Sequence, residues 1–277
     1  MSIAGVVAVV LLGVSPVVLG QEQSSPLVDV NALVRRAIQH RLEESREHPN
    51  RPLRYVVRQN DGRQDATRDV IETKDGDVDR LVALDGKPLS AEAERAELAR
   101  LDDLARHPEQ QEQRHKNEQK FREREEHLAS LVPDAFVYKL EGVEPCASGQ
   151  CYRLSLAPNP QFNPPDRAAT LFRGVAGEVW IDRERERLEK LDVHFIANVD
   201  FGFGILGRVN KGGTVLVEQR DAGGNDWVLT SLKLNMTGRV LMVKSFRRQL
   251  DEEMDHYTPV APMTYREAIE LLKKGGL

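Results

Sequence analysis

Aromatic side chains are scarce in this chain: they make up 5% of its 277 residues, and tryptophan occurs only twice. The stacking platforms of a sugar-binding groove are therefore few, which argues against a glycosidase despite the abundance of carboxylates that such an enzyme pairs. G-x-S-x-G, the turn that presents the nucleophile of α/β-hydrolases, is absent. Catalysis has no positive support, so we expect no catalytic residue and a protein that is not an enzyme. An exported hydrolase whose site no motif marks is the remaining enzymatic alternative.

Patterns that bind metals or phosphates are missing as well. His107, His115 and His127 share one charged segment, but their spacings of 8 and 12 residues do not form the i, i+4 pair of a helical metal site. The glycines of residues 202–207 match G-x-G-x-x-G, which binds a dinucleotide only between a buried parallel strand and a helix. Here an alternating strand precedes the glycines and another strand follows them. We therefore expect no phosphate site, no metal and no cofactor.

Cysteine is nearly absent, since only Cys146 and Cys151 occur. The four residues between them fit a hairpin loop, whose two ends lie close enough to bridge. The alternative, a redox or metal site, needs C-x-x-C or further His and Cys ligands nearby, and the sequence has neither. We expect a structural disulfide, and a ring this small stabilises the fold by about 2 kcal/mol.

The first twenty residues carry no charged side chain and form an apolar run that ends in Val18-Leu19-Gly20 and turns polar afterwards. This pattern is typical of a secretory signal peptide, and we expect cleavage after Gly20 and a periplasmic or secreted protein. An uncleaved anchor is the alternative, although the run is short for a bilayer span and Pro16 interrupts it. The net charge of -5 gives no reason to expect a protein built to bind nucleic acid or acidic lipid surfaces.

Two kinds of element alternate in the N-terminal half. Apolar residues at helical spacing predict a helix over 29–47, and three Asp-Gly turns within residues 52–88 predict a meander of short antiparallel strands. Residues 90–131 then predict a charged helical hairpin, broken at His107-Pro108. Its near-balanced charges indicate a solvated face, with docking of a partner protein as the alternative.

Strands dominate the C-terminal half, with AFVYKLEGV and CYRLSLA pairing across the disulfide loop. Residues 190–203 alternate apolar and polar side chains, which predicts one long half-buried strand, and RVLMVKSFRRQL at 239–250 predicts another. Short helices are expected over 168–176 and over 265–273. The sequence predicts an α+β fold: a curved antiparallel sheet or incomplete β-barrel whose concave face the helices cover, with the charged hairpin inserted. One domain covers 21–277.

Three stretches carry a resemblance to a known superfamily: GEVWIDRERERLEKLDVHF (177–195), NKGGTVLVEQR (210–220) and WVLTSLKLNMTGRVLMVK (227–244). With the export signal and the N-terminal helix, they resemble the lipoprotein-localisation-factor superfamily, which includes LolA, LolB and the sigma-regulator RseB. The likeness covers roughly 130–260, more loosely 30–90, and leaves out the charged hairpin. It implies a half-barrel that holds acyl chains or another hydrophobic group, or that receives a lipoprotein signal.

We therefore expect an exported, non-enzymatic protein that binds an acyl chain, lipid or lipoprotein in a half-barrel cavity. Peripheral or transient contact with a membrane is part of this expectation, and nucleic acid is not. The alternative function is an interaction or sensor module that docks an envelope protein through residues 90–131. We expect eight residues at the cavity wall or mouth, from the alternation of apolar and polar residues along the strands and from the apolar residues in the Gly-rich connection at 200–213. They are Trp180, Phe195, Phe201, Phe203, Ile205, Leu206, Leu234 and Met236, and packing in the core is the alternative for Phe201, Phe203, Ile205 and Leu206.

Overall fold

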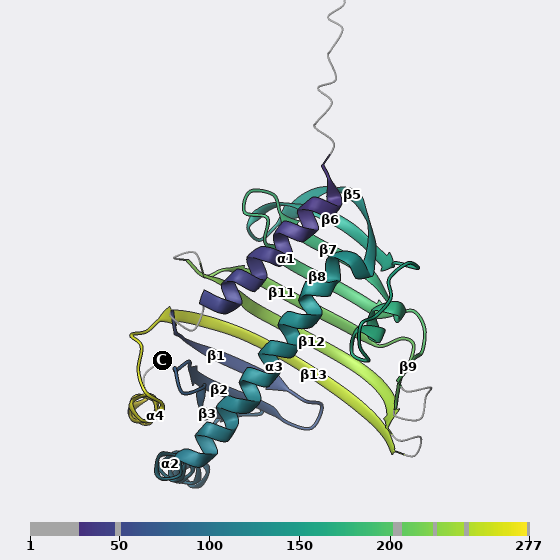
Figure 1. Cartoon of the computed structure of the whole chain (residues 1–277). Helices are drawn as coiled ribbons and strands as arrows, with labels where there is room; N and C mark the ends of the chain where they lie inside the picture. Colours follow the sequence, from purple (N-terminus) through teal and green to yellow (C-terminus); the bar gives the residue numbers. More distant parts are fainter. Residues whose placement is uncertain (1–27, 48–50, 202–206, 224–225, 241–243, 276–277) are drawn as a thin grey trace, which may run out of the picture.

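The computed structural model describes residues 28–47, 51–201, 207–223, 226–240 and 244–275, and these residues form one open antiparallel sheet crossed by helices (Figure 1). The strands are β1 (Leu53–Asn60), β2 (Asp65–Ile71), β3 (Val78–Leu84), β4 (Lys87–Pro88), β5 (Phe136–Cys146), β6 (Gly149–Pro158), β7 (Val175–Asp182), β8 (Leu188–Phe195), β9 (Val199–Phe201), β10 (Gly207–Val209), β11 (Thr214–Asp221), β12 (Trp227–Val240) and β13 (Lys244–Pro259). The helices are α1 (Val30–Glu47), α2 (Ala91–Arg106), α3 (Pro108–Ala135), α4 (Tyr265–Lys274) and the 3-10 helix η2 (Ala169–Gly174). The predicted α+β class, with an open curved sheet, is confirmed.

The first and the last strand of the chain, β1 and β13, lie side by side near the middle of the sheet. The order is β4-β3-β2-β1-β13-β12-β11-β8-β7-β6-β5, with β10 pairing β12 and β9 beside this path. The N-terminal meander therefore pairs through β1 with the C-terminal strand β13. The sheet does not close into a barrel, because β3–β4 and β5 lie at opposite edges. The longest strands, β12 and β13, consequently lie at its centre.

Pairing register defines two faces of the sheet. Val193 of β8 lies opposite Val215 of β11, Val215 opposite Leu234 of β12, and Leu234 opposite Leu250 of β13. Side chains that lie opposite one another share a face, since successive residues of a strand alternate. We call this side the helix face, because Val193 and Val215 pack with α1, and the other side the outer face.

The larger hydrophobic core lies between α1 and strands β5–β8. Leu33, Val34 and Ala37 of α1 are almost completely buried there, against Leu154 and Val179 among others. Full burial of an aliphatic side chain of this size contributes about 1.5–3 kcal/mol. The helix predicted over 29–47 is confirmed, and its apolar stripe is the part of it that is buried.

A second core closes the meander edge of the sheet. Here α2 and α4 pack on Ile71 and Val78, and the side chain of Glu97 accepts the backbone N–H of Leu81. Arg100 donates to the carbonyl oxygen of Asp79. The side chains of α2 thus occupy polar groups of an edge strand that would otherwise be open to pairing with another chain.

Turn and cap predictions are confirmed in detail. Gly62, Gly76 and Gly86 all have positive φ, at 82°, 97° and 71°, as the three Asp-Gly turns require. Thr264 begins α4 with a reciprocal capping box that includes Glu267. These features depend on neighbouring residues only, which is why the sequence could predict them.

Several predicted boundaries are wrong. The strand expected over 190–203 is two strands, because the chain leaves the sheet after Phe195, where the N–H of Ile196 bonds the carbonyl of Gly174. The strand expected over 239–250 is the end of β12 and the start of β13. The charged hairpin continues to Ala135, with Pro133 inside the helix. Of the three helices expected as covers, α4 instead packs with α2 beside the meander, and α3 crosses the sheet (Figure 1).

The disulfide is present between Cys146 and Cys151, with a Cα–Cα distance of 5.8 Å. It closes the β5–β6 hairpin as predicted. A buried carboxylate holds the loop, because Glu189 accepts the backbone N–H groups of Ala147 and Ser148 together with the hydroxyl of Ser148. The loop is therefore tied to β8 as well as to itself.

Candidate functional site

An apolar floor runs along the helix face of the four central strands. Between the strand ends, register places nine apolar side chains on this face, together with Gln59 and Glu252, which bond each other at 2.6 Å, and all but two of the nine stay partly exposed. The nine are Val215, Val217, Leu232, Leu234, Met236, Leu250, Met254, Val57 and Tyr55, of which Leu250 and Met254 are buried. We call this set the floor. Apolar surface that is neither packed nor fully open to water is what a site for an apolar ligand provides.

Helix α3 passes over the floor as a strap (Figure 1). Its backbone comes closest to α1, α2, η2 and β5. The better buried side of the helix repeats every three or four residues and is polar throughout its first half, at Gln111, Arg114, Glu118 and Arg122. The strap therefore lacks an apolar stripe with which to fill the floor.

Polar contacts fasten the strap at both ends. Near its start, Gln111 donates to the carbonyl of Asp75 at 3.0 Å, and Glu118 accepts the N–H of Asp77 at 3.3 Å. Near its end, Arg41 of α1 bonds Glu125 at 2.8 Å, and α1 and α3 run side by side. Between these ends, the described side chains of residues 120–124 make no hydrogen bond or ion pair. The strap is thus held at its ends and free of side-chain bonds in its middle.

Asp79 is the strongest of these fastenings. Its carboxylate bonds Arg114 of the strap at 2.9 Å and Arg68 of β2 at 2.7 Å, and Arg100 of α2 lies 3.6 Å away. Burial acts to raise the pKa of Asp79, but the charges of Arg100, Arg114 and Arg68 together lower it below its usual value. One carboxylate thus joins both helices of the hairpin to the sheet.

Tyr55 is the aromatic residue of the floor, and Tyr257 stacks against it. The rings of Tyr55 and Tyr257 stack with centroids 5.0 Å apart, and the hydroxyl of Tyr257 donates to the carbonyl of Leu229 at 2.5 Å. Burial is the main cause that raises the pKa of Tyr55 well above its usual value. The hydroxyl groups are therefore neutral, and the rings lie near three carboxylates, those of Asp77, Glu72 and Glu252, whose charges also raise the pKa of Tyr55.

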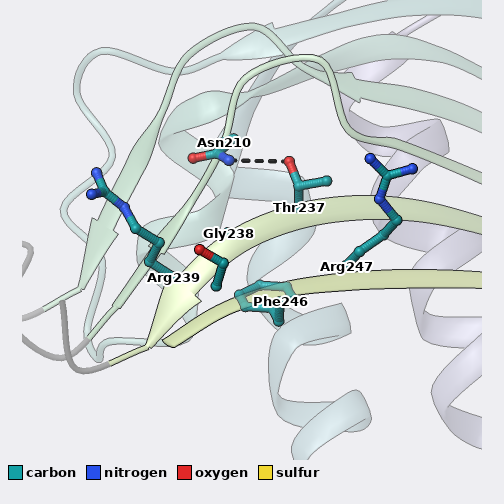
Figure 2. A pocket seen from close by; sticks show the side chains of 7 residues that line it. Asn210, Thr237, Gly238, Arg239, Phe246 and Arg247 are labelled. Carbon is teal, nitrogen blue, oxygen red and sulfur yellow. Dashed lines mark hydrogen bonds between the residues drawn. The ribbon is translucent and has the colours of Figure 1, made fainter. Parts of the chain in front are cut away.

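At the far end of the central strands lies a hollow of about 590 Å³. Figure 2 shows Arg239 and Arg247 on either side of the hydrogen bond from Asn210 to Thr237, which measures 3.1 Å. Gly238 is required here, because a Cβ at this position would overlap the carbonyl oxygen of Arg208 and the ring of Phe246. The hollow is lined by polar and basic groups, with Phe246 as its aromatic contribution.

Four of the eight residues predicted at the cavity lie in two neighbouring places. Leu234 and Met236 belong to the floor, and Phe195, Phe201 and Met236 form or flank a small cluster around Val199 at the strand ends. Phe195 is 4% exposed, so it contributes to packing there.

The structure places none of the other four predicted residues in these two places. Trp180 lies on the outer face, opposite Arg153 and Lys190, and its indole N–H bonds Glu144. The structure therefore does not bring Trp180 together with the other predicted residues. Phe203, Ile205 and Leu206 lie outside the described residues.

One group of potential metal ligands occurs in the described part of the chain. Single ligand atoms of Cys146, Cys151 and Glu189 lie within 4.8 Å of one another. The two sulfur atoms are joined in the disulfide, and Glu189 already accepts backbone N–H groups of the loop. The arrangement is that of a fastened loop. In the described residues, no helix is long and apolar enough to cross a bilayer.

Sequence reasoning missed the polar side of the strap and the arginines around Asp79. A signal for the first exists, because residues 111–122 place polar side chains at every position where a covering helix needs an apolar one. The second has no local signal, since Arg68, Arg100 and Arg114 come from three separate elements.

Comparison with known proteins gave matches of fold only. No family model and no curated protein matches the chain. A solved structure of a DUF1329 family protein from Desulfovibrio piger is 10% identical, with a TM-score of 0.28 over 85% of this chain and 95% of that one. A LolA superfamily protein from Nitrosomonas europaea is 11% identical, with a TM-score of 0.28 over 82% and 95% of the two chains. MucB, solved in complex with the periplasmic part of MucA, is 12% identical, with a TM-score of 0.23 over 82% and 99%.

These structures carry the LolA-like and MucB/RseB names that the sequence resemblance implied. Scores and identities this low assign no ligand, partner or activity to this chain.

Proposed function

We propose that this chain is a non-enzymatic binding protein that takes an apolar ligand, an acyl chain of a lipid or lipoprotein, on the floor beneath the strap. The observation that carries the proposal is the mismatch between these two layers. The floor is apolar and partly exposed, whereas the strap above it presents Gln111, Arg114, Glu118 and Arg122 and is fastened only at its ends. A ligand with its own apolar surface would complete this packing.

An acyl chain suits the floor better than a compact polar ligand. The floor crosses four neighbouring strands, and its side chains are aliphatic apart from Tyr55. Burial of an alkyl chain gains about 0.8 kcal/mol per methylene, from which the cost of ordering the ligand is subtracted. The export signal expected in the sequence places such a carrier in the envelope or outside the cell.

The first test uses the full chain purified from its own periplasm, with native mass spectrometry and lipid extraction. Co-purifying lipid is the expected result. A chain that carries none and takes up no fluorescent fatty acid would contradict the proposal.

Two neighbouring residues of β12 then locate the ligand. Leu234 belongs to the floor, and Asn235 is exposed on the outer face. We expect Leu234→Glu to abolish uptake of the fluorescent fatty acid, because the carboxylate would have to be desolvated in contact with the alkyl chain. Asn235→Glu adds the same charge to the same strand and should bind as the wild type does. Equal binding by the two variants would place the ligand elsewhere.

A second candidate function is docking of an envelope protein on the outside of the strap. Phe121 favours it, because this ring is 69% exposed in the middle of a charged helix. Deletion of residues 90–131 would also remove α2 and expose the edge of β3, so a point substitution is the cleaner experiment. Loss of partner capture in Phe121→Ser, with fatty-acid uptake unchanged, would support this second function.

A further inference from the structure

One segment of the chain has a charge composition unlike the rest. Residues 227–250 contain five Lys and Arg and no Asp or Glu, although the whole chain has 44 acidic residues and a net charge of -5. The structure places this segment in β12 and the first part of β13, the two longest strands of the sheet. The net charge of the chain therefore conceals a local excess of positive charge.

Four of these cations gather where β12 ends and β13 begins. Arg239, Lys244, Arg247 and Arg248 are all exposed, and among the described residues none of their side chains makes an ion pair or hydrogen bond. We call these four residues the strand-end patch. The fifth cation, Lys233, lies further along β12 and is paired with Asp251 and Glu253. The patch thus makes no ion pair of its own in the described part of the chain, and Asp200, the carboxylate whose pKa the charge of Arg239 helps to lower, is already paired with Arg208.

The patch surrounds the end of the hairpin and does not lie on one face of the sheet. Register puts Lys244 and Arg248 on the helix face, opposite Val240 and Met236. Arg239 lies opposite Ser245, and Arg247 lies two residues further along the same strand on the same outer face. Figure 2 shows Arg239 and Arg247 beside the hollow at this end. Charge on both faces suits a contact made end-on with an extended surface.

Apolar groups accompany the cations. Val240 is 44% exposed at the end of β12, and Phe246 lines the hollow between the basic side chains. Basic side chains around an exposed apolar residue match the interface of a bilayer, where phosphate groups lie above acyl chains. Each Lys or Arg near an anionic bilayer strengthens binding about fivefold.

Both an anionic bilayer and a long polyanion could bind a basic patch, and the charge of the remaining chain favours the bilayer. With the patch set aside, the remaining chain is more acidic than the whole, so a nucleic acid that extends along it would be repelled. A bilayer touched only by the strand ends interacts mainly with charges within about a Debye length, roughly 8 Å at physiological salt, and acidic groups beyond that distance are screened. We propose that the strand-end patch docks the protein on an anionic phospholipid bilayer.

This contact is separate from the floor and does not depend on the proposed function. A protein that carries no acyl chain would still dock, and a carrier that lost the patch would still hold its ligand. The two sites therefore fail independently in the experiments.

The test is flotation of the full chain with vesicles of phosphatidylcholine, with and without 30% phosphatidylglycerol. We expect binding only to the vesicles that contain phosphatidylglycerol, and we expect it to weaken steeply as salt is raised. Arg239→Gln/Arg247→Gln removes the two cations of the patch that lie on the outer face, away from the floor, and should weaken binding about 30-fold.

Lys74→Gln/Lys87→Gln is the matched control, because both residues are exposed, make no ion pair within the described residues, and lie in the meander. It should bind the vesicles as the wild type does. Thermal unfolding and fatty-acid uptake of both double variants should remain unchanged, which separates a docking defect from a folding or ligand defect. Equal binding to neutral vesicles, an equal loss in both double variants, or capture by soluble poly-glutamate as strong as by vesicles would overturn the proposal.

Discussion

Two long helices, α1 and α3, cross the same face of the same sheet and run side by side, yet they do so on different physical terms. Leu33, Val34 and Ala37 of α1 are at most 4% exposed and belong to the main core. The strap α3 buries only Gln111 and Ala135 along its 28 residues. The first helix is held by apolar burial along its length and the second by polar contacts at its ends. The same sheet face is thus covered by one apolar and one largely polar helix, and the floor beneath the polar helix is where we propose that a ligand binds.

The largest change in stability that we expect comes from removing a buried side chain of α1. Leu33→Ala removes a side chain that is 0% exposed and should lower the free energy of unfolding by about 2–5 kcal/mol. Phe121→Ala in the strap is the matched change and should stay within about 0.5 kcal/mol. Urea unfolding of both variants measures the difference. Similar losses in the two would show that the strap is packed in the same way as α1.

A smaller effect should follow from unfastening the strap. Asp79→Asn removes the negative charge that Arg68, Arg100 and Arg114 share, and it should cost about 1–3 kcal/mol. Hydrogen exchange should accelerate in residues 108–118 and remain unchanged in α1. Asp103→Asn in α2, a carboxylate that is half exposed, is a control that should leave exchange of the strap unchanged. Faster exchange throughout the sheet would mean that Asp79 supports the whole fold.

The smallest effect is a dependence on pH. The arginines lower the pKa of Asp79, so the folded protein binds this proton less readily than the unfolded chain does. The stabilisation is then complete above the unfolded value of about 3.9 and is lost as the pH falls through the lowered pKa. We expect exchange protection of residues 108–118 to hold from pH 7 to about 5 and to fall below about 4. The step should be missing in Asp79→Asn, and a step of equal size in that variant would assign it to other carboxylates.

The candidate site was only partly predictable, and the case of Trp180 shows why. Alternation alone placed Leu234 and Met236 on one face of their strand, and pairing confirms that they share the floor. The face of Trp180 depends on the register between β7 and β8, in which it lies opposite Lys190 while Val179 lies opposite Leu191. A shift of one residue would reverse the outcome, and no local pattern fixes the shift. The sequence could assign residues of one strand to a common face of the sheet, but it could not show which residues of different strands share a face.

The sequence by itself determined the local elements: the helix over 29–47, the Asp-Gly turns, the disulfide hairpin and the capped C-terminal helix. Each depends on spacing or backbone preference within a few residues, where propensity and turn chemistry act directly. Only the tertiary structure decided that β1 pairs with β13, that α3 crosses the floor, and that Asp79 collects three arginines. It also decided which cations are neutralised, since Lys233 meets two carboxylates across the strands and the strand-end patch meets none in the described residues. These outcomes join residues far apart in the chain, and the competition between burial and charge that settles them exists only once the strands have paired.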